Sequence, residues 1–224
     1  MMRQRLARPL QRLRRSAVRL RAESRAVAAV ELAILAPVLT LMGLGSIELA
    51  NMAICYMRIN QVAITVADNT SRAKQSSPSG GAMMREFDVN DTLAQVDLLY
   101  PGLQVYNNGR IIVSSLERNA DGGQWIHWQR CLGSYTTGVS RYGTEGTGAT
   151  GTSLTGMGPA TNQVSADADS AIMFVEVFYQ YQPIFFNVGG SPPTIYRAAA
   201  MYVRDDRDLT QIYNLTPTVT VNSC

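Results

Sequence analysis

The run Arg25-Ala-Val-Ala-Ala-Val-Glu31-Leu-Ala-Ile-Leu-Ala-Pro37 opens a long apolar stretch in this chain of 224 residues. From Leu32 to Met57 the only strongly polar side chains are Glu48 and Asn51. About 20 apolar residues, each rising about 1.5 Å along a helix, are enough to cross a bilayer. The stretch therefore predicts a transmembrane helix, which we assign to residues 27–57.

The charges before this stretch predict its orientation. Residues 1–25 contain nine arginines and one acid, Glu23, a net charge of +8; because the whole chain carries +3, residues 26–224 carry −5. Arginines gathered on one side of a span keep that side in the cytoplasm. We therefore expect residues 1–26 to be a cytoplasmic arginine-rich leader and the residues after the span to be exported.

Two other interpretations of the leader are weaker. A nucleic-acid-binding arm is also rich in arginine, but here an apolar span follows directly, so we expect no nucleic-acid partner. A cleaved secretory signal has an apolar core of about 7–15 residues and a small-residue cleavage site. The apolar run here is longer and has no clear site of that kind, which favours a retained anchor.

The helix is expected to continue beyond the membrane. No proline occurs between Val38 and Ser77, and apolar residues recur at helical spacing from Ile59 to Ala73. Ser76-Ser-Pro-Ser-Gly-Gly81 then ends the pattern. We predict one helix from about Ala26 to Gln75, bent at Pro37, with residues 58–77 forming an exported stalk.

Residues 78–224 predict an exported α+β domain. Asn90-Asp91 would cap a short helix that ends before Pro101-Gly102, and Asn107-Asn108-Gly109 has the composition of a hairpin turn. Gly138–Pro159 is rich in glycine and threonine and predicts a mobile surface loop or excursion; no Gly-Lys-Ser/Thr follows to make it a phosphate loop. The expected strands are Gln104–Tyr106, Ile111–Leu116, Gln124–Arg130, Ala171–Tyr181, Thr194–Val203 and Thr218–Val221.

The strongest of these strand patterns is Ala171–Tyr181. One face carries large apolar residues without interruption, whereas Glu176 and Gln180 interrupt the other. This alternation is typical of a central strand that is covered by a helix on one side and only partly covered on the other.

The three cysteines agree with export. In an oxidising compartment Cys131 and Cys224 are the natural disulfide pair, and Cys55 remains a thiol in or near lipid. The alternative is that all three are free thiols.

The sequence gives little sign of catalysis. Its single histidine, His127, lies in a strand-like run between Trp125 and Trp128, and the common hydrolase and zinc motifs are missing. Asp205-Asp206-Arg207-Asp208 lacks the spacing and turn glycine of a calcium loop, so we expect a solvated acidic turn. We therefore predict no enzyme, no metal site and no cofactor.

The segment Ala28-Ala-Val-Glu31-Leu-Ala-Ile-Leu-Ala-Pro37, followed by Gly45-Ser-Ile-Glu48-Leu-Ala, resembles the N-terminus of the TadE/TadF-like pseudopilins of the Tad type IVc pilus system. That family has an Ala-Val-Glu-Phe-Ala type run before a proline and a second glutamate about 17 residues later. Val175-Glu-Val-Phe-Tyr-Gln-Tyr-Gln-Pro183 is also similar to a Val-x-Val-x-Tyr-x-Tyr-x-Pro run found late in the family.

The resemblance implies a pilin-like α+β fold, a bacterial inner-membrane location with a periplasmic C-terminal domain, and trimming by a prepilin peptidase. Carried over to this chain, the cut falls between Ala26 and Val27; family substrates prefer glycine where this chain has Ala26. The new amine at Val27 would lie one helical turn from Glu31. A pair of opposite charges costs far less to bury than either charge alone, so Glu31 would neutralise the amine and set the register between subunits. The same resemblance places Pro37 and Glu48 in the assembly helix. For Glu48, a location among the outer headgroups and a packing role both remain open.

These observations together predict a minor pilin or pseudopilin that takes part in assembly of a Tad-type adhesion pilus, with other Tad pilins and the prepilin peptidase as partners. One alternative is a membrane-anchored extracytoplasmic binding or adhesin domain that never enters a filament. An anchored enzyme is the other, disfavoured by the missing motifs.

Overall fold

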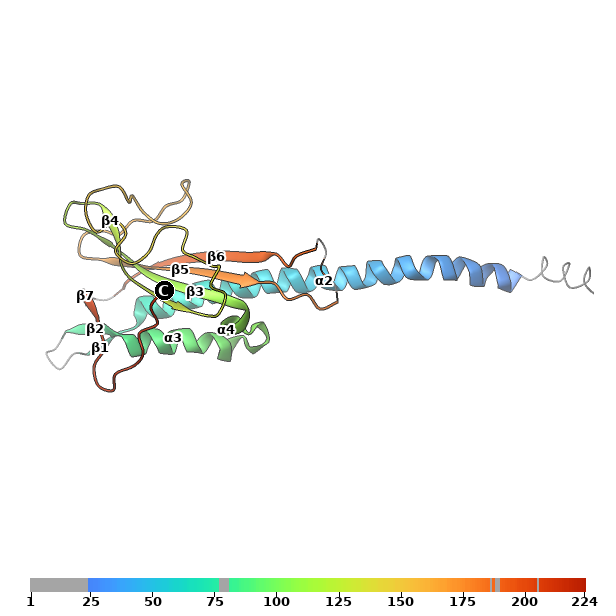
Figure 1. Cartoon of the computed structure of the whole chain (residues 1–224), viewed down its shortest axis with the longest axis horizontal. Helices are drawn as coiled ribbons and strands as arrows, with labels where there is room; N and C mark the ends of the chain where they lie inside the picture. The colour runs from blue at the N-terminus through green and yellow to red at the C-terminus, as the bar shows by residue number, and fades with distance from the viewer. Residues whose placement is uncertain (1–23, 77–80, 186, 188–189, 205) are drawn as a thin grey trace, which may run out of the picture. The chain divides into compact units, whose positions relative to one another are not determined.

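The computed structural model describes residues 24–76, 81–185, 187, 190–204 and 206–224 (Figure 1). The leader predicted for residues 1–26 therefore lies outside the described residues as far as residue 23. Internal contacts divide the chain into two units, Met1–Ala50 and Asn51–Cys224. We call the described part of the first the N-terminal segment and the second the C-terminal domain.

Helix α2, Ser24–Arg72, begins in the N-terminal segment and ends in the C-terminal domain. This confirms the single long helix read from the sequence, with Pro37 inside it. The helix ends slightly earlier than predicted, because Gln75–Ser76 forms the short strand β1. At its last turn the guanidinium of Arg207 donates hydrogen bonds to the carbonyls of Thr70 (3.0 Å) and Ala73 (2.8 Å). A cation here satisfies carbonyls that have no partner within the helix.

An antiparallel four-stranded sheet with the order β4-β3-β5-β6 forms the centre of the C-terminal domain. Its strands confirm four of the predicted ones, each within a few residues. Their bounds are Gly109–Arg118 for β3, Gln124–Leu132 for β4, Ala171–Gln180 for β5 and Thr194–Tyr202 for β6.

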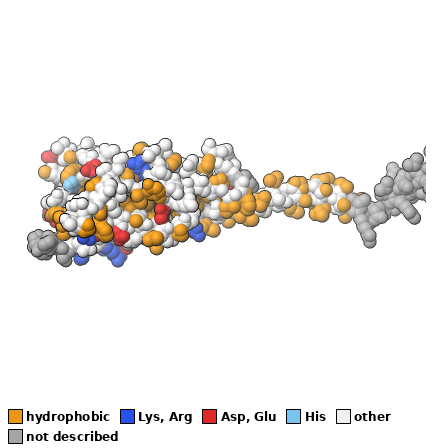
Figure 2. Space-filling model, turned by 60° about the horizontal axis from the view of Figure 1, so that its bottom comes forward, with side chains coloured by type: hydrophobic (Ala, Val, Ile, Leu, Met, Phe, Trp, Pro, Cys, Tyr) orange, Lys and Arg blue, Asp and Glu red, His pale blue; other side chains and the backbone are white. Residues whose placement is uncertain are grey.

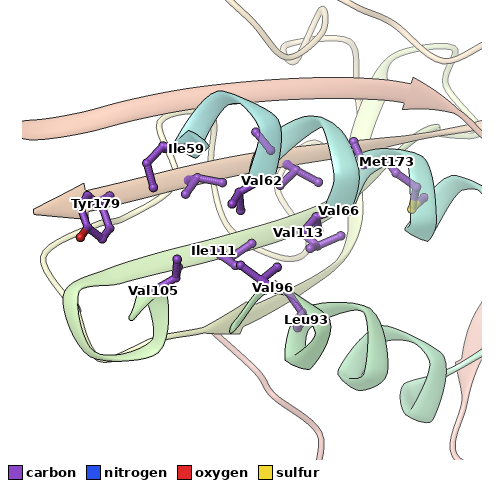
Figure 3. Close-up of a cluster of buried hydrophobic side chains, with 14 of the residues drawn as sticks. Ile59, Val62, Val66, Leu93, Val96, Val105, Ile111, Val113, Met173 and Tyr179 are labelled. Carbon is purple, nitrogen blue, oxygen red and sulfur yellow. The ribbon is translucent and has the colours of Figure 1, made fainter. Parts of the chain in front are cut away.

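The main core lies between this sheet and two helices, α2 and α3 (Figure 3). The predicted apolar face of β5 is buried there, and Ile59, Val62 and Val66 of α2 are almost fully buried against it. Truncating one such residue to alanine typically costs about 2–5 kcal/mol. The stalk assigned to residues 58–77 stays a prediction. The buried residues that α2 contributes to this core begin at Cys55, within the span predicted for residues 27–57.

The other face of β5 is covered more fully than expected. Ile172 and Phe174 join a second core cluster with Met157, and Tyr142 and Leu154 pack against that cluster. The last three residues belong to the Gly138–Pro159 excursion, which contains no helix or named strand. The excursion was predicted, but its apolar anchors were not.

The two edges of the sheet differ. The outer edge of β4 is covered: Ile126 exchanges backbone hydrogen bonds with Gly146 and Thr147 (both 2.8 Å), and the Cys131 amide donates to Asn222 (2.7 Å). On β6, the opposite edge strand, no backbone hydrogen bond joins the outer side to another described residue. The sheet is therefore closed at β4 and open at β6 within the described part of the chain.

A smaller sheet joins β1, β2 (Ala82–Arg85) and β7 (Arg207–Tyr213), and helix α3 (Glu86–Leu99) follows β2. The sequence prediction missed β2 and β7 and began the α3 helix too late. Asp88 and Arg85, not Asn90-Asp91, form its capping box.

Three local predictions are wrong. Gln104–Tyr106 is not a strand, because a 3-10 turn (η1, Pro101–Leu103) runs into a one-turn helix, α4 (Val105–Asn108). Asn107-Asn108-Gly109 is therefore not a hairpin turn. Gly109 is needed for a different reason, since a Cβ there would lie 2.8 Å from the Phe178 carbonyl oxygen. Thr218–Val221 is also not a strand; Asn90 holds the Thr220 carbonyl through its side chain instead (2.8 Å).

Candidate functional site

The N-terminal segment exposes many large apolar side chains along α2 (Figure 2). Surfaces of this extent mark sites of interaction with membranes or with other proteins. Among the described residues, one helix is long and apolar enough to cross a membrane, and it is this one. The large side chains that are at least half exposed here are Val27, Val30, Leu32, Ile34, Leu35, Val38, Leu39, Leu41, Met42, Ile47 and Leu49.

The residues predicted to act in processing and assembly all lie on α2. The peptide bond between Ala26 and Val27 is inside the helix, and the Val27 side chain is exposed. Glu31 is exposed as well and lies one turn further along, since residues four apart share a helix face. Pro37 is also exposed. The helix therefore places Val27 and Glu31 on one face, as an amine–carboxylate pair would require.

Glu48 differs from Glu31, because only 1% of it is exposed. A carboxylate is costly to bury unless other groups compensate for its lost hydration. Both roles of Glu48 that the sequence left open, at the outer headgroups and in packing, stay predictions.

A serine, a carboxylate and a histidine meet on β3 and β4, but not as a catalytic triad. Glu117 accepts a hydrogen bond from Ser115 (2.6 Å) through one oxygen and contacts Nδ1 of His127 (2.8 Å) through the other. A nucleophilic serine must instead give its proton to the histidine. Ser115 is also fully buried, and the His127 ring stacks on Trp125. The group therefore has the features of a structural polar cluster, as expected for a packed strand histidine.

A second polar cluster joins α3, β4 and the excursion. The Arg130 guanidinium contacts the buried Glu86 carboxylate at 2.6–3.0 Å and Oε2 of Glu145 at 2.9 Å. Glu145 also accepts from the Gln129 amide (3.0 Å). One charged side chain thereby fixes three segments that are far apart in the sequence.

Glu176, which interrupts the apolar pattern of β5, is fully buried and holds the start of the excursion. Its carboxylate accepts hydrogen bonds from the Ser140 hydroxyl (2.5 Å), the Arg141 amide (3.1 Å) and the Tyr196 phenol (3.0 Å). Burial, reinforced by the negative charge of Glu176, raises the pKa of Tyr196. The sequence analysis did not predict this role. An acidic residue at an inward-facing position of a central strand could have indicated that the carboxylate is buried and hydrogen-bonded.

The predicted disulfide between Cys131 and Cys224 is present. It ties the C-terminus to β4, beside the Asn222 hydrogen bond. Cys55 is a free thiol, as predicted, but it is buried in the main core of the C-terminal domain and not at a lipid-facing position.

Metal ligands do not converge in the part of the chain that is described, where no group of three or more His, Cys, Asp or Glu side chains forms. A solvated acidic turn was predicted at residues 205–208. This prediction is wrong at Arg207, because Arg207 is buried and begins strand β7. Asp208 is exposed, and hydrogen bonds from Thr210 and Tyr213 lower the pKa of its carboxyl. Asp205 lies outside the described residues.

An open cleft of about 400 Å³ lies beside the excursion. Polar groups dominate its walls, which include Arg118, Gln124 and Asp167.

Comparisons with known proteins give one match. The model of the TadE-like protein family matches residues 26–68, which lie entirely within α2 and include the Ala26–Val27 bond, Glu31, Pro37 and Glu48. No curated protein and no solved structure matches the chain. The resemblance read from the sequence is thus confirmed where it was strongest, and over residues 26–68 this chain is similar to the TadE-like protein family.

Proposed function

We propose that this chain is a minor pilin, or pseudopilin, that takes part in the assembly of a Tad-type pilus and has no catalytic role. The TadE-like match supports a Tad pilus-associated component. The observation that carries the finer proposal is the exposed apolar face of α2, which bears Glu31 one turn after Val27. Such a face serves both a membrane before assembly and neighbouring helices after it.

We further propose that residues 1–26 remain in the cytoplasm and that the C-terminal domain is exported across the inner membrane. The arginine charge before the span and the disulfide in the C-terminal domain support this orientation. A reporter active only in the cytoplasm, fused after Cys224, should be silent. Reporter activity would reverse the orientation.

The proposed mechanism assigns Glu31 to pairing. After cleavage between Ala26 and Val27, the amine of one subunit would be neutralised by a Glu31 carboxylate, either its own or that of a neighbour. Removing one partner of a buried ion pair typically costs about 3–5 kcal/mol. Glu31→Gln should therefore leave membrane insertion intact and reduce assembly.

The test combines two variants with one control. Glu31→Gln and Ala26→Trp should each reduce piliation, the second by blocking cleavage. Thr40→Val is the matched control, because it also removes a polar group from an exposed position of α2. The Thr40 hydroxyl donates to the Ala36 carbonyl within the same helix. The N-terminus of the mature protein should be Val27. A mature protein that keeps its leader, with normal piliation in Glu31→Gln, would reduce α2 to a plain anchor.

The alternative, an anchored binding domain outside any filament, has one structural observation in its favour. The polar cleft beside the excursion is large enough for a small ligand. Under this alternative, Arg118→Ala would impair adhesion and leave piliation unchanged. The minor-pilin proposal expects Glu31→Gln to affect piliation and Arg118→Ala to leave it unaltered.

A further inference from the structure

The connection between β5 and β6 carries two large apolar side chains on the surface of the C-terminal domain. Ile184 is 56% exposed and Phe185 is 50% exposed. They lie four and five residues after the end of β5, a strand whose residues are almost all buried. Two adjacent exposed apolar side chains are more stable in an environment less polar than water, such as a membrane or a protein surface.

Hydrogen bonds at the base of the connection fix where it lies in the domain. The Tyr181 amide donates to the Pro193 carbonyl (3.1 Å), which closes the connection. The side-chain amide of Asn51 donates to the Tyr181 phenol oxygen (2.7 Å). Asn51 is the first residue of the C-terminal domain, so the chain passes from this domain to the apolar N-terminal segment beside the same connection.

The length of the N-terminal segment places the membrane surface near this point. Residues 27–50 form a helical stretch of about 36 Å at about 1.5 Å per residue. The hydrocarbon core of a bilayer is about 30 Å thick, and about 40–45 Å with its headgroups. A helix that spans the core with these residues therefore meets the outer headgroups within a few residues of Asn51.

We propose that Ile184 and Phe185 insert into the outer interfacial layer of the membrane that α2 spans. Apolar and aromatic side chains at this depth exchange water for lipid while the backbone of their loop stays among polar headgroups. The loop then forms a second membrane attachment beside the helix and restrains the tilt of the C-terminal domain. This inference rests on the membrane anchorage proposed above.

The test measures the depth of single spin labels on the full-length chain in lipid nanodiscs. Each label is placed at an introduced cysteine in a Cys55→Ala background, with the native disulfide left intact. Phe185→Cys and Ile184→Cys report the loop, and Leu39→Cys reports the span. Tyr202→Cys is the matched control, because Tyr202 is an exposed aromatic residue (48%) at the far end of β6, about 26 Å from Thr194 at about 3.3 Å per residue.

Collisions of each label with oxygen, which partitions into lipid, are compared with collisions with a water-soluble nickel chelate. The ratio of oxygen to nickel accessibility at residues 184 and 185 should be several-fold higher than at residue 202, and highest at residue 39. A water-like ratio at 184 and 185 with a lipid-like ratio at 39 overturns this inference and leaves the anchor intact. Shielding of the loop labels from both reagents would indicate a protein contact and also overturn it. A water-like ratio at 39 overturns the anchor itself.

Discussion

The guanidinium of Arg130 on β4 and the carboxylate of Glu86 at the start of α3 form a buried, two-pronged ion pair, with nitrogen–oxygen distances of 2.6–3.0 Å. Glu86 precedes Arg130 by 44 residues. The pair therefore fixes the position of α3 against the edge of the large sheet, and its neighbour Cys131 fixes the C-terminus at the same place.

Breaking this pair on one side should destabilise the fold strongly. Arg130→Met leaves the Glu86 charge buried without its counter-ion, a defect worth about 3–5 kcal/mol. The double variant Glu86→Leu/Arg130→Met should recover most of the loss, because no charge is then left buried. Denaturant unfolding of the full chain in detergent measures both. Arg72→Met is the control: its exposed pair with Asp68 should contribute less than about 1 kcal/mol. Equal losses in Arg130→Met and Arg72→Met would contradict the prediction.

Loss of the disulfide should free the C-terminus. In the chain-entropy view, a bond between Cys131 and Cys224, 93 residues apart, stabilises the fold by up to about 4–5 kcal/mol. The double variant Cys131→Ser/Cys224→Ser should unfold at lower denaturant concentration and be cut by protease first near residues 214–224. Cys55→Ala is the control, because it removes a cysteine that is not part of the disulfide. It should not make the C-terminus the first site of cleavage. An unchanged unfolding midpoint in the double variant would show that the tail is held by its hydrogen bonds alone.

Glu117 should make stability depend on pH in an unusual direction. Burial raises the pKa of its carboxyl above the ordinary 4.5, although the hydrogen bond from Ser115 and the charge of His127 oppose the shift. Because the folded state binds this proton more tightly than the unfolded state, the charged carboxylate weakens the fold above the raised pKa. That penalty disappears as pH falls through the raised pKa toward 4.5.

The measurement compares the wild type with Glu117→Gln between pH 7.5 and 4.5. The unfolding free energy of the wild type should rise relative to that of the variant as pH falls. The difference between the two proteins cancels the titration of all other carboxyls. A constant difference across this range, or one with the opposite slope, would disprove the assigned shift.

Arg207 should be required for the end of α2. Arg207→Met removes the donors to the Thr70 and Ala73 carbonyls, and hydrogen bonds to charged groups contribute about 1.5–3 kcal/mol each. Amide hydrogen exchange in the last turn of α2 should accelerate, and the unfolding free energy should fall. Arg204→Met, at an exposed position with a 3.8 Å contact to Asp68, should change neither by much. If both variants behave alike, Arg207 does not cap the helix.

The elements that were predictable from the sequence are those with a long local pattern. Helix α2 has helical periodicity and no further proline after Pro37, and β5 is apolar over nearly its whole length, with polar residues on one face only. Such patterns report burial on a regular element and need no knowledge of distant residues.

The missed elements depend on pairing across the chain. Strand β2 has only four residues and pairs in parallel with β7, more than 100 residues later. Arg207 reads as part of an acidic turn because its partners, the carbonyls at the end of α2, carry no sequence signal. Glu145 and Met157 anchor the excursion through contacts that neither residue's neighbours reveal. In the candidate site, local motif spacing was enough to put Glu31 and the Ala26–Val27 bond on one helix, whereas it did not predict the burial of Glu48.

The unequal edges of the large sheet limit how copies of this domain can associate. An uncovered edge strand can pair with another strand, and β6 offers such an edge, whereas the outer side of β4 is already occupied by its own chain. Two copies could meet β6 to β6, but a third would find no edge of the large sheet left to join. A polymer of many copies cannot propagate through its large sheets alone, and its repeating contacts must come from another surface.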